Sequence, residues 1–192
     1  MPHPSNWSSR DALEDAVLTF IVQQGLTQWS LRSLADHLGV STYTLTYHFG
    51  SKEQLLGVIL ARFETQMQAM MQTWALETGM TTSMLLRRFW EWLLVPERTS
   101  LGQTFFDIYA QALRHPEQFA QLLASGFPAW NTMLQQRLEK DGLPQSSSVV
   151  VASILVSSVT GLYLDWLTLH DTTRTTQAVT YLCQWVDTLL RQ

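Results

Sequence analysis

The hydrophobic positions of this chain recur with helical spacing almost throughout, and no stretch alternates steadily between apolar and polar residues. The first segment places apolar residues at i, i+3, i+4, i+7 and i+8, which is one face of a helix: Leu13, Ala16, Val17, Phe20 and Ile21. Ser8 or Ser9 suits the N-cap of this helix, and Gly25 suits the position just past its end. The pattern predicts an all-α protein.

Three more helices are expected before residue 75. A short one has its N-cap at Ser30, ends at Gly39, and carries the apolar stripe Leu31, Leu34, Ala35 and Leu38. Another short segment runs from Ser41 to about His48. Ser51 and Gln54 then form a capping-box pattern. That box opens a long helix with the stripe Leu56, Ile59, Leu60, Phe63, Met67, Met70, Met71 and Trp74.

The second half predicts five further helices, for a total of about nine. Their expected ranges are 82–94, 100–114, 117–141, 147–170 and 173–190, separated by proline, glycine and Asp-Thr positions. Within the third of these, Gly126 and Pro128 are expected to break or kink the helix. The predicted domains are 1–50, a three-helix head, and 51–192, a larger helical domain.

Composition narrows the class of protein. With 192 residues and 46% hydrophobic residues, the chain is neither disordered nor collagen-like. A single cysteine, Cys183, provides no internal disulfide and no zinc-binding thiol cluster, which favours a cytoplasmic setting. We expect no secretory signal at the start of the chain. Ser and Thr interrupt the most apolar stretch, Val149–Leu164, so we expect a buried helix and no membrane partner.

The stretch from Trp29 to Lys52 predicts a helix-turn-helix. Ala35 is small enough for two helices to cross closely, and Gly39 supplies a positive φ. Val40, Leu45 and Phe49 would close a small core on the inner side. The outer side then exposes hydroxyls, aromatic edges and an imidazole without any acidic residue: Thr42, Tyr43, Thr44, Thr46, Tyr47 and His48. Such a helix suits the major groove of DNA.

The segment SLRSLADHLGVSTYTLTYHFGSKEQLL resembles the DNA-binding region of TetR-family transcriptional repressors. The shared pattern is an apolar-x-x-Leu-Ala stripe, Leu-Gly-Val-Ser, a Thr-Leu recognition segment ending in His-Phe, and Ser-Lys-Glu-x-Leu-Leu. The family's usual Tyr after Thr-Leu is Thr46 here, and the adjacent Tyr47 points about 100° around the helix from it.

The resemblance implies a homodimer with two DNA-binding heads and a helical half that binds ligand and dimerises. It implies phosphate contacts for Ser30 and Lys52 and a groove-facing role for Arg32. The predicted DNA-binding set is Ser30, Arg32, Ser33, Thr42, Tyr43, Thr44, Tyr47, His48 and Lys52. Up to residue 62 the chain holds four basic and five acidic residues, so we expect only moderate salt dependence of DNA binding.

Several of these residues have ordinary structural interpretations as well. Arg32 also suits a solvated helix face, and His48 also suits a place at the core edge against Phe49. The aromatic residues of the second half are the candidate ligand-binding set, although large aromatics at helical spacing usually belong to the core. That set is Trp92, Phe105, Tyr109, Trp130, Tyr163 and Trp166, and it predicts a lipophilic effector.

Catalysis has little support. No two histidines have the i, i+3 or i+4 spacing of a helical metal pair, and no phosphate-binding loop or nucleophile elbow occurs. We therefore expect no catalytic residue, no metal and no cofactor. For assembly, two stripes on the last two helices predict a four-helix dimer interface, with burial inside one chain as the alternative. The stripes are Val149, Ala152, Leu155, Val156, Val159 and Tyr163, and Ala178, Leu182, Trp185, Val186 and Leu189.

Together these patterns predict a cytoplasmic, homodimeric transcriptional regulator. We expect a repressor that binds a near-palindromic double-stranded DNA operator and is released by a small-molecule effector. The alternative is a helical ligand-binding or scaffold protein with a degenerate helix-turn-helix, and a helical enzyme is a third class.

Overall fold

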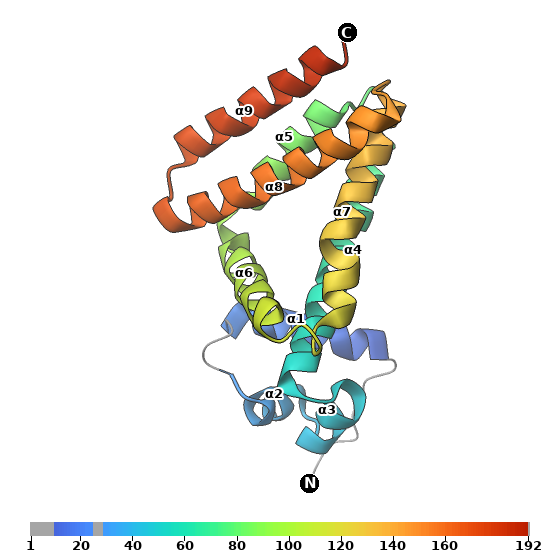
Figure 1. Ribbon diagram of the computed structural model, residues 1–192. Helices are drawn as coiled ribbons and strands as arrows, with labels where there is room; N and C mark the ends of the chain where they lie inside the picture. Colours follow the sequence, from blue (N-terminus) through green and yellow to red (C-terminus); the bar gives the residue numbers. More distant parts are fainter. Residues whose placement is uncertain (1–9, 25–28, 192) are drawn as a thin grey trace. The chain divides into compact units, whose positions relative to one another are not determined.

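The computed structural model describes residues 10–24 and 29–191, and over these ranges the chain is helical with no strand (Figure 1). Nine α-helices and one 3-10 helix occur in the described ranges, which confirms the all-α prediction. The chain packs as two compact units. Unit 1 comprises residues 1–65 and 103–125, and unit 2 comprises residues 66–102 and 126–192. The functional boundary at residue 50 stays a prediction.

Unit 1 contains the three short helices α1 (Arg10–Gln24), α2 (Leu31–Leu38) and α3 (Thr42–Phe49). The predicted face of α1 is buried at Leu13, Val17, Phe20 and Ile21, as the spacing requires. The predicted caps Ser8 or Ser9 and Gly25 lie outside the described residues. α2 packs on both α1 and α3, so the three short helices form one small bundle.

The long helix α4 (Lys52–Ala75) begins at the predicted capping box. The Gln54 backbone N–H donates to Ser51 Oγ at 3.2 Å, and the Ser51 N–H donates to Gln54 Oε1 at 2.9 Å. The predicted stripe is buried at Leu56, Ile59, Leu60, Phe63, Met67 and Met71. Met70 and Trp74 are only half-buried.

The remaining helices match the predicted ranges to within three residues. They are α5 (Thr82–Leu93), the 3-10 turn η1 (Pro96–Arg98), α6 (Thr99–Arg114), α7 (Ala120–Lys140), α8 (Gln145–Leu169) and α9 (Thr172–Leu189). The expected break at Gly126 and Pro128 does not occur, because α7 continues through both positions. One turn later, Asn131 Nδ2 donates to the Phe127 carbonyl at 2.9 Å.

Unit 2 is built around α9, which packs on both α5 and α8 (Figure 1). A buried polar network holds the start of α5 to the end of α7: Asp141 accepts from the Thr82 N–H and hydroxyl at 2.7 Å and from Arg137. The guanidinium of Arg137 also donates to the carbonyls of Ala75 and Met80. These bonds satisfy groups that burial would otherwise leave without water.

The apolar stripe that was predicted to form the dimer interface on α8 faces the interior of the chain instead. Ala152, Leu155, Val156, Val159 and Tyr163 are all buried inside the chain, and only Val149 is exposed. On α9, Val186 is fully buried and the other stripe positions are half-buried. The stripe therefore serves the core of unit 2. The open face of α8 carries Val150, Ser153, Ile154, Ser157, Gly161 and Leu164 instead.

α8 is also long and apolar enough to cross a membrane by length and composition alone. In its most apolar window, 39% of the residues are buried inside the structure. Core helices of soluble proteins meet the same criterion, so the property is a weak indication of a membrane segment.

Candidate nucleic-acid interface

The turn between α2 and α3 is defined by two caps and one glycine. Gly39 has φ +66° in the left-handed region, and its N–H donates to the Asp36 carbonyl at 3.4 Å. No atom lies within 4 Å of a Cβ built at Gly39, so the backbone conformation alone favours glycine there. Val40 N–H then donates to the Ala35 carbonyl at 3.0 Å. This sets the direction in which α3 leaves the turn.

α3 has an inner and an outer side, as predicted. On the inner side, Leu45 and Phe49 are buried together with Leu34 and Ala35 of α2. The outer side exposes Thr42, Tyr43, Thr46 and Tyr47. Tyr43 and Tyr47 are 74% and 73% exposed, although large aromatic side chains are usually buried. The structure therefore presents two phenol rings on a helix whose opposite side is fixed.

Hydroxyl groups near the outer side are largely occupied by local bonds. Ser33 N–H donates to Ser30 Oγ at 3.1 Å, while the Ser30 N–H donates to Ser33 Oγ at 2.9 Å. The Thr44 hydroxyl lies 2.8 Å from Ser41 Oγ, the N-cap of α3. These groups order the two helix starts, and a hydroxyl that serves as a cap can still accept a further hydrogen bond.

Thr46 occupies the position at which the resembling family usually has Tyr. Its hydroxyl donates back to the helix, at 3.1 Å from the carbonyls of Thr42 and Tyr43. Because the threonine side chain is short and its hydroxyl bonds to its own helix, Thr46 does not project from the helix as a tyrosine would. The exposed Tyr43 and Tyr47 are the long side chains of this surface.

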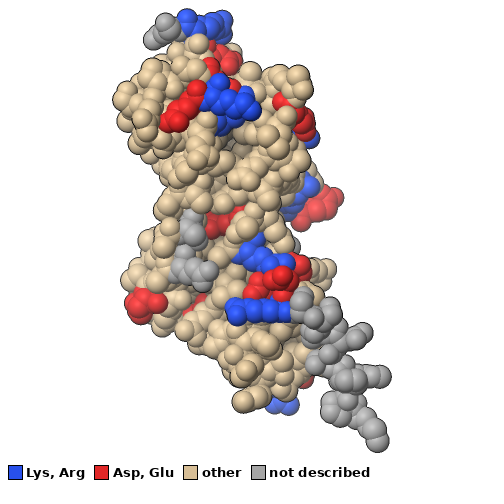
Figure 2. Space-filling view, turned by 90° about the vertical axis from the view of Figure 1, so that its right-hand side faces the viewer, with Lys and Arg blue, Asp and Glu red and all other residues tan. Residues whose placement is uncertain are grey.

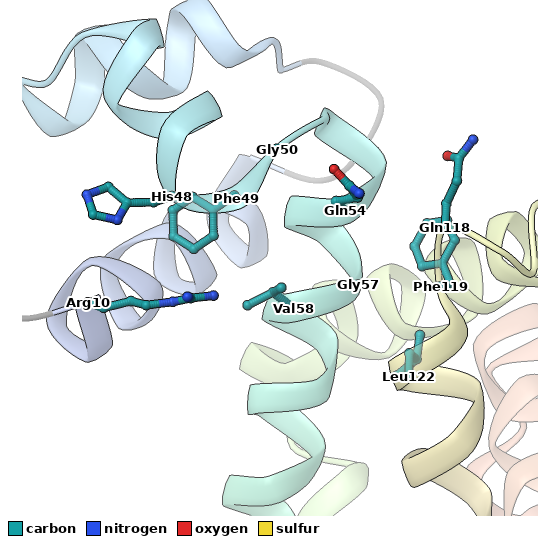
Figure 3. A pocket seen from close by; sticks show the side chains of 10 residues that line it. All are labelled: Arg10, His48, Phe49, Gly50, Gln54, Gly57, Val58, Gln118, Phe119 and Leu122. Carbon is teal, nitrogen blue, oxygen red and sulfur yellow. The ribbon is translucent and has the colours of Figure 1, made fainter.

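His48 lies at the edge of the outer surface. It is half-buried, and its ring contacts Tyr47 edge-on at 5.2 Å and Phe49 at 6.3 Å between centroids. It also lines a pocket of about 290 Å³ within unit 1 (Figure 3). The structure thus places His48 against Phe49, as the core-edge interpretation expects, while leaving part of the ring open.

The same pocket borders the end of α3. His48 and Phe49 line it together with Arg10 of α1, Val58 of α4, Phe119 just before α7, and Leu122 of α7 (Figure 3). Phe119 is buried, and a Cβ built at Gly57 of α4 would come within 3.2 Å of its ring. Gly57 therefore permits the close approach of the Phe119 ring to α4.

The Lys52 side chain contacts Trp29, the residue just before the N-cap of α2. Its ammonium donates to the Trp29 carbonyl at 3.0 Å and lies 4.4 Å from the centroid of the Trp29 ring. This contact ties the first residue of α4 to the residue just before the Ser30 cap. The Lys52 side chain remains partly exposed, so its contact with Trp29 also fixes the position of a positive charge relative to α2.

Acidic residues form ion pairs with two other cations of unit 1, Arg62 and Arg10. Arg62 makes a two-pronged contact with Asp15 at 2.7 and 3.0 Å and lies 3.3 Å from both Asp11 and Glu14. The hydrogen bond to Asp15 raises the pKa of Arg62 further above its ordinary value. Arg10 pairs with Glu14 at 2.9 Å. Basic side chains beside acidic ones are also the common arrangement on the face shown in Figure 2.

Arg32 differs from these cations. It is exposed near the start of α2 and forms no ion pair with any carboxylate of the described residues. Its charge is therefore available to a partner molecule. Among the predicted DNA-binding residues, Arg32, Thr42, Tyr43 and Tyr47 are the ones whose side chains are exposed and not used in a cap.

The predicted ligand-binding aromatics fall into separate clusters. In unit 1, Phe105 and Tyr109 contact each other on α6 at 4.7 Å. In unit 2, Tyr163 and Trp166 stack at 5.7 Å with planes 8° apart. Trp92 and Trp130 each contact Phe89, at 6.0 and 5.5 Å.

One polar group in this region was missed by the sequence analysis. Glu64 of α4 is only 3% exposed, and its Oε1 accepts the Tyr109 hydroxyl at 2.7 Å. Burial raises the pKa of Glu64 to about 7 and raises that of Tyr109 above its ordinary value. The signal was present, because Glu64 lies four residues after Leu60 and three before Met67, inside the buried stripe.

Comparison with known proteins gives two family matches. Residues 14–59 match the bacterial regulatory proteins of the TetR family, and residues 84–191 match the C-terminal domain of BetI-type transcriptional repressors. No curated protein matches the chain.

Solved structures share the fold. A TetR transcriptional regulator from Legionella pneumophila is 20% identical, with a TM-score of 0.70 over 95% of this chain and 98% of that one. The multidrug binding protein EbrR, complexed with imidazole, is 22% identical, with a TM-score of 0.62 over 88% and 92%. The fatty acid degradation regulator FadR from Bacillus halodurans is 15% identical, with a TM-score of 0.62 over 92% and 93%. At these identities the likeness concerns the fold.

Proposed function

Since the chain belongs to the TetR family of bacterial transcriptional regulators, we propose that it is a repressor that leaves its DNA operator when a small molecule binds. The observation that carries the DNA-binding part is the two-sided helix α3. Leu45 and Phe49 fix its inner side, while Tyr43 and Tyr47 project from its outer side. A helix held in this way presents a rigid surface to the major groove.

The proposed contacts divide into two kinds. Arg32, Thr42, Tyr43 and Tyr47 are exposed and reach the groove and its borders. Ser30, Ser33, Thr44, His48 and Lys52 order the helix starts and the edge of the surface, and they contact the DNA backbone. Because few cations are available, hydroxyl and phenol groups supply much of the contact, which keeps the salt dependence moderate.

The proposed assembly is a homodimer through the open face of α8 together with α9. Val150, Ile154 and Leu164 are exposed on α8, and Tyr181 is exposed on α9. The small residues Ser153, Ser157 and Gly161 lie among them and permit a second helix to approach closely. Two recognition helices then occupy major grooves about 34 Å apart, on a near-palindromic operator. Such a complex acts in the cytoplasm.

The proposed effector is a small lipophilic molecule. The supporting features are the aromatic clusters that contain Phe105 and Tyr109, Trp92 and Trp130, and Tyr163 and Trp166. One solved structure of this fold is a multidrug binding protein. Calorimetry and tryptophan fluorescence with lipophilic aromatic compounds test this part, and binding limited to small polar metabolites contradicts it. The regulator itself needs no catalytic residue.

Genomic footprinting with the purified protein tests the DNA-binding part. We expect protection of a near-palindromic site, followed by a gel shift of the DNA flanking the protein's own gene. Lipophilic effectors should reverse the shift. A folded protein that protects no DNA but binds lipophilic ligands would instead support a helical ligand-binding or scaffold protein with a degenerate helix-turn-helix. Turnover without DNA binding would support an enzyme.

A further inference from the structure

The buried carboxyl of Glu64 has one oxygen without a partner. Oε1 accepts the Tyr109 hydroxyl at 2.7 Å, whereas Oε2 is buried and has no hydrogen-bond partner among the described residues. No Lys, Arg or His of the described residues contributes a charge beside it. Removing a carboxylate oxygen from water without giving it a hydrogen-bond donor costs free energy, so a buried oxygen of this kind usually has a hydrogen-bond partner.

Tyr109 connects this carboxyl to a chain of aromatic rings on α6. The Tyr109 ring contacts Phe105 at 4.7 Å, and Phe105 contacts Phe106 edge-on at 5.1 Å with planes 90° apart. Aromatic faces attract cations, and a carboxylate oxygen accepts an N–H. A neutral lipophile satisfies only the rings, and an organic acid is repelled where the Glu64 carboxyl is ionised, above its pKa of about 7. A protonated amine with an apolar body satisfies both.

We infer that Glu64 and Tyr109 form the polar end of the effector site and that the effector is an apolar, aromatic molecule carrying a protonated amine. The inference rests on the proposed effector-released repressor and names the chemical class of its effector. The ammonium N–H donates to Glu64 Oε2, while Tyr109 keeps its hydrogen bond to Oε1.

Helix α4 connects Glu64 to the DNA-binding head. Glu64 lies twelve residues after Lys52 on one continuous helix, which corresponds to about 18 Å. Lys52 is the residue that bonds the Trp29 carbonyl before α2. Tyr109 stands on α6, so the Glu64–Tyr109 bond joins α6 to α4. An amine at Glu64 therefore acts on the helix that follows the recognition helix α3.

Four probes that share one carbon skeleton test the inference. They are 4-phenylbutylamine, its trimethylammonium analogue, 4-phenylbutan-1-ol and 4-phenylbutanoate, each measured by calorimetry on the full chain at a pH of about 8, above the pKa of Glu64. We expect the amine to bind at least tenfold tighter than the alcohol and the carboxylate not to bind. The trimethylammonium analogue should fall between amine and alcohol, because it is a cation without an N–H.

Variants of Glu64 and Tyr109 test which side chain causes the preference for the amine over the alcohol. Glu64→Gln should remove the amine-over-alcohol preference and leave binding of the alcohol unchanged. Tyr109→Phe should keep the preference, because the carboxylate remains. Glu91→Gln removes one exposed carboxylate elsewhere and is the matched control. If Glu64→Gln melts below the working temperature, Glu64→Asp replaces it and should retain the preference with weaker binding.

Equal binding of amine and alcohol, no binding of the amine, or a preference that survives Glu64→Gln would overturn the inference. Operator binding without probe is measured on every variant and decides the proposed function separately. A protein that binds DNA but does not prefer the amine remains a repressor with another effector. A protein that prefers the amine but binds no DNA contradicts the repressor and not the Glu64 site.

Discussion

Tyr43 and Tyr47 lie one turn apart on α3 with ring centroids 6.2 Å apart and ring planes 28° from parallel. Both rings are almost three-quarters exposed, while Leu45, between them in sequence, is fully buried. Folding does not need these two phenols to be where they are. An exposed aromatic pair on an otherwise anchored helix is typical of a binding surface.

Replacing this pair should separate binding from stability. We expect Tyr43→Ala and Tyr47→Ala each to weaken operator binding by tenfold or more and to change the free energy of unfolding by less than about 0.5 kcal/mol, because surface substitutions remove little packing. Gel shifts and urea melts measure the two quantities. Leu113→Ala, which removes another exposed side chain, is the control. Operator affinity unchanged in both tyrosine variants would refute the assigned surface.

Arg32 should account for part of the salt dependence. In a dimer, Arg32→Ala removes two positive charges from the borders of the groove, where phosphates lie, so the slope of log K against log salt should become shallower by about 2. Arg191→Ala, near the other end of the chain, should leave the slope unchanged. An Arg32→Ala variant with weaker binding but an unaltered slope would mean that Arg32 does not contact phosphate. A wild-type slope steeper than about −10 would contradict the moderate dependence expected here.

The described helices of the head and the caps at Ser30, Gly39 and Ser51 were predictable because those features are local. The Ser51–Gln54 box and the glycine at position 39 are determined by neighbours within four residues, and the structure has both. The sides of α3 were predictable for the same reason, since Leu45 and Phe49 share one face of a helix.

Contacts between distant segments were not predictable from spacing. The apolar stripe of α8 shows that one face is buried, but whether its own chain or a second copy covers that face depends on how α5 and α9 pack. Pro128 inside α7 and the bond between Glu64 and Tyr109, 45 residues apart, also depend on tertiary context. A proline is tolerated where packing outweighs the lost hydrogen bond.

Gly102 of α6 should be intolerant of a larger residue. A Cβ built there would come within 2.6 Å of Tyr163 Cε1, and the Tyr163 ring is itself stacked on Trp166. Gly102→Ala should therefore lower the free energy of unfolding by about 1–3 kcal/mol, as overpacking usually does. Gly161→Ala on α8 meets no atom within 4 Å and should be neutral or stabilising by up to about 1 kcal/mol. Equal effects of the two substitutions would contradict this packing.

The open face of α8 should control assembly. Ile154→Glu places a charge among exposed apolar residues and should convert a dimer into a monomer at micromolar concentration, with loss of operator binding. Leu76→Glu puts the same charge on another exposed apolar position and should leave the mass unchanged. Light scattering measures both. A dimer that survives Ile154→Glu, or a wild-type monomer, would place the interface elsewhere or remove it.

Glu64 should make stability depend on pH in a distinct window. In the unfolded chain the carboxyl loses its proton near its ordinary pKa of 4.5, whereas burial raises the pKa to about 7 in the folded chain. Between these values the folded state binds more protons, so the contribution of Glu64 to stability falls as the pH rises from about 4.5 to 7 and is constant above that. The full loss is on the order of 3 kcal/mol.

Comparison with a Gln variant isolates this effect. Glu64→Gln cannot titrate, so the variant should gain on the wild type as the pH rises from 4.5 to 8, by up to about 3 kcal/mol in the free energy of unfolding. Urea melts at several pH values measure the difference. Glu91→Gln, at an exposed position, should show a much smaller change over the same window. If the difference in the free energy of unfolding between wild type and Glu64→Gln does not change with pH, the carboxyl is paired or hydrated in solution. Oε2 then already has a hydrogen-bond donor.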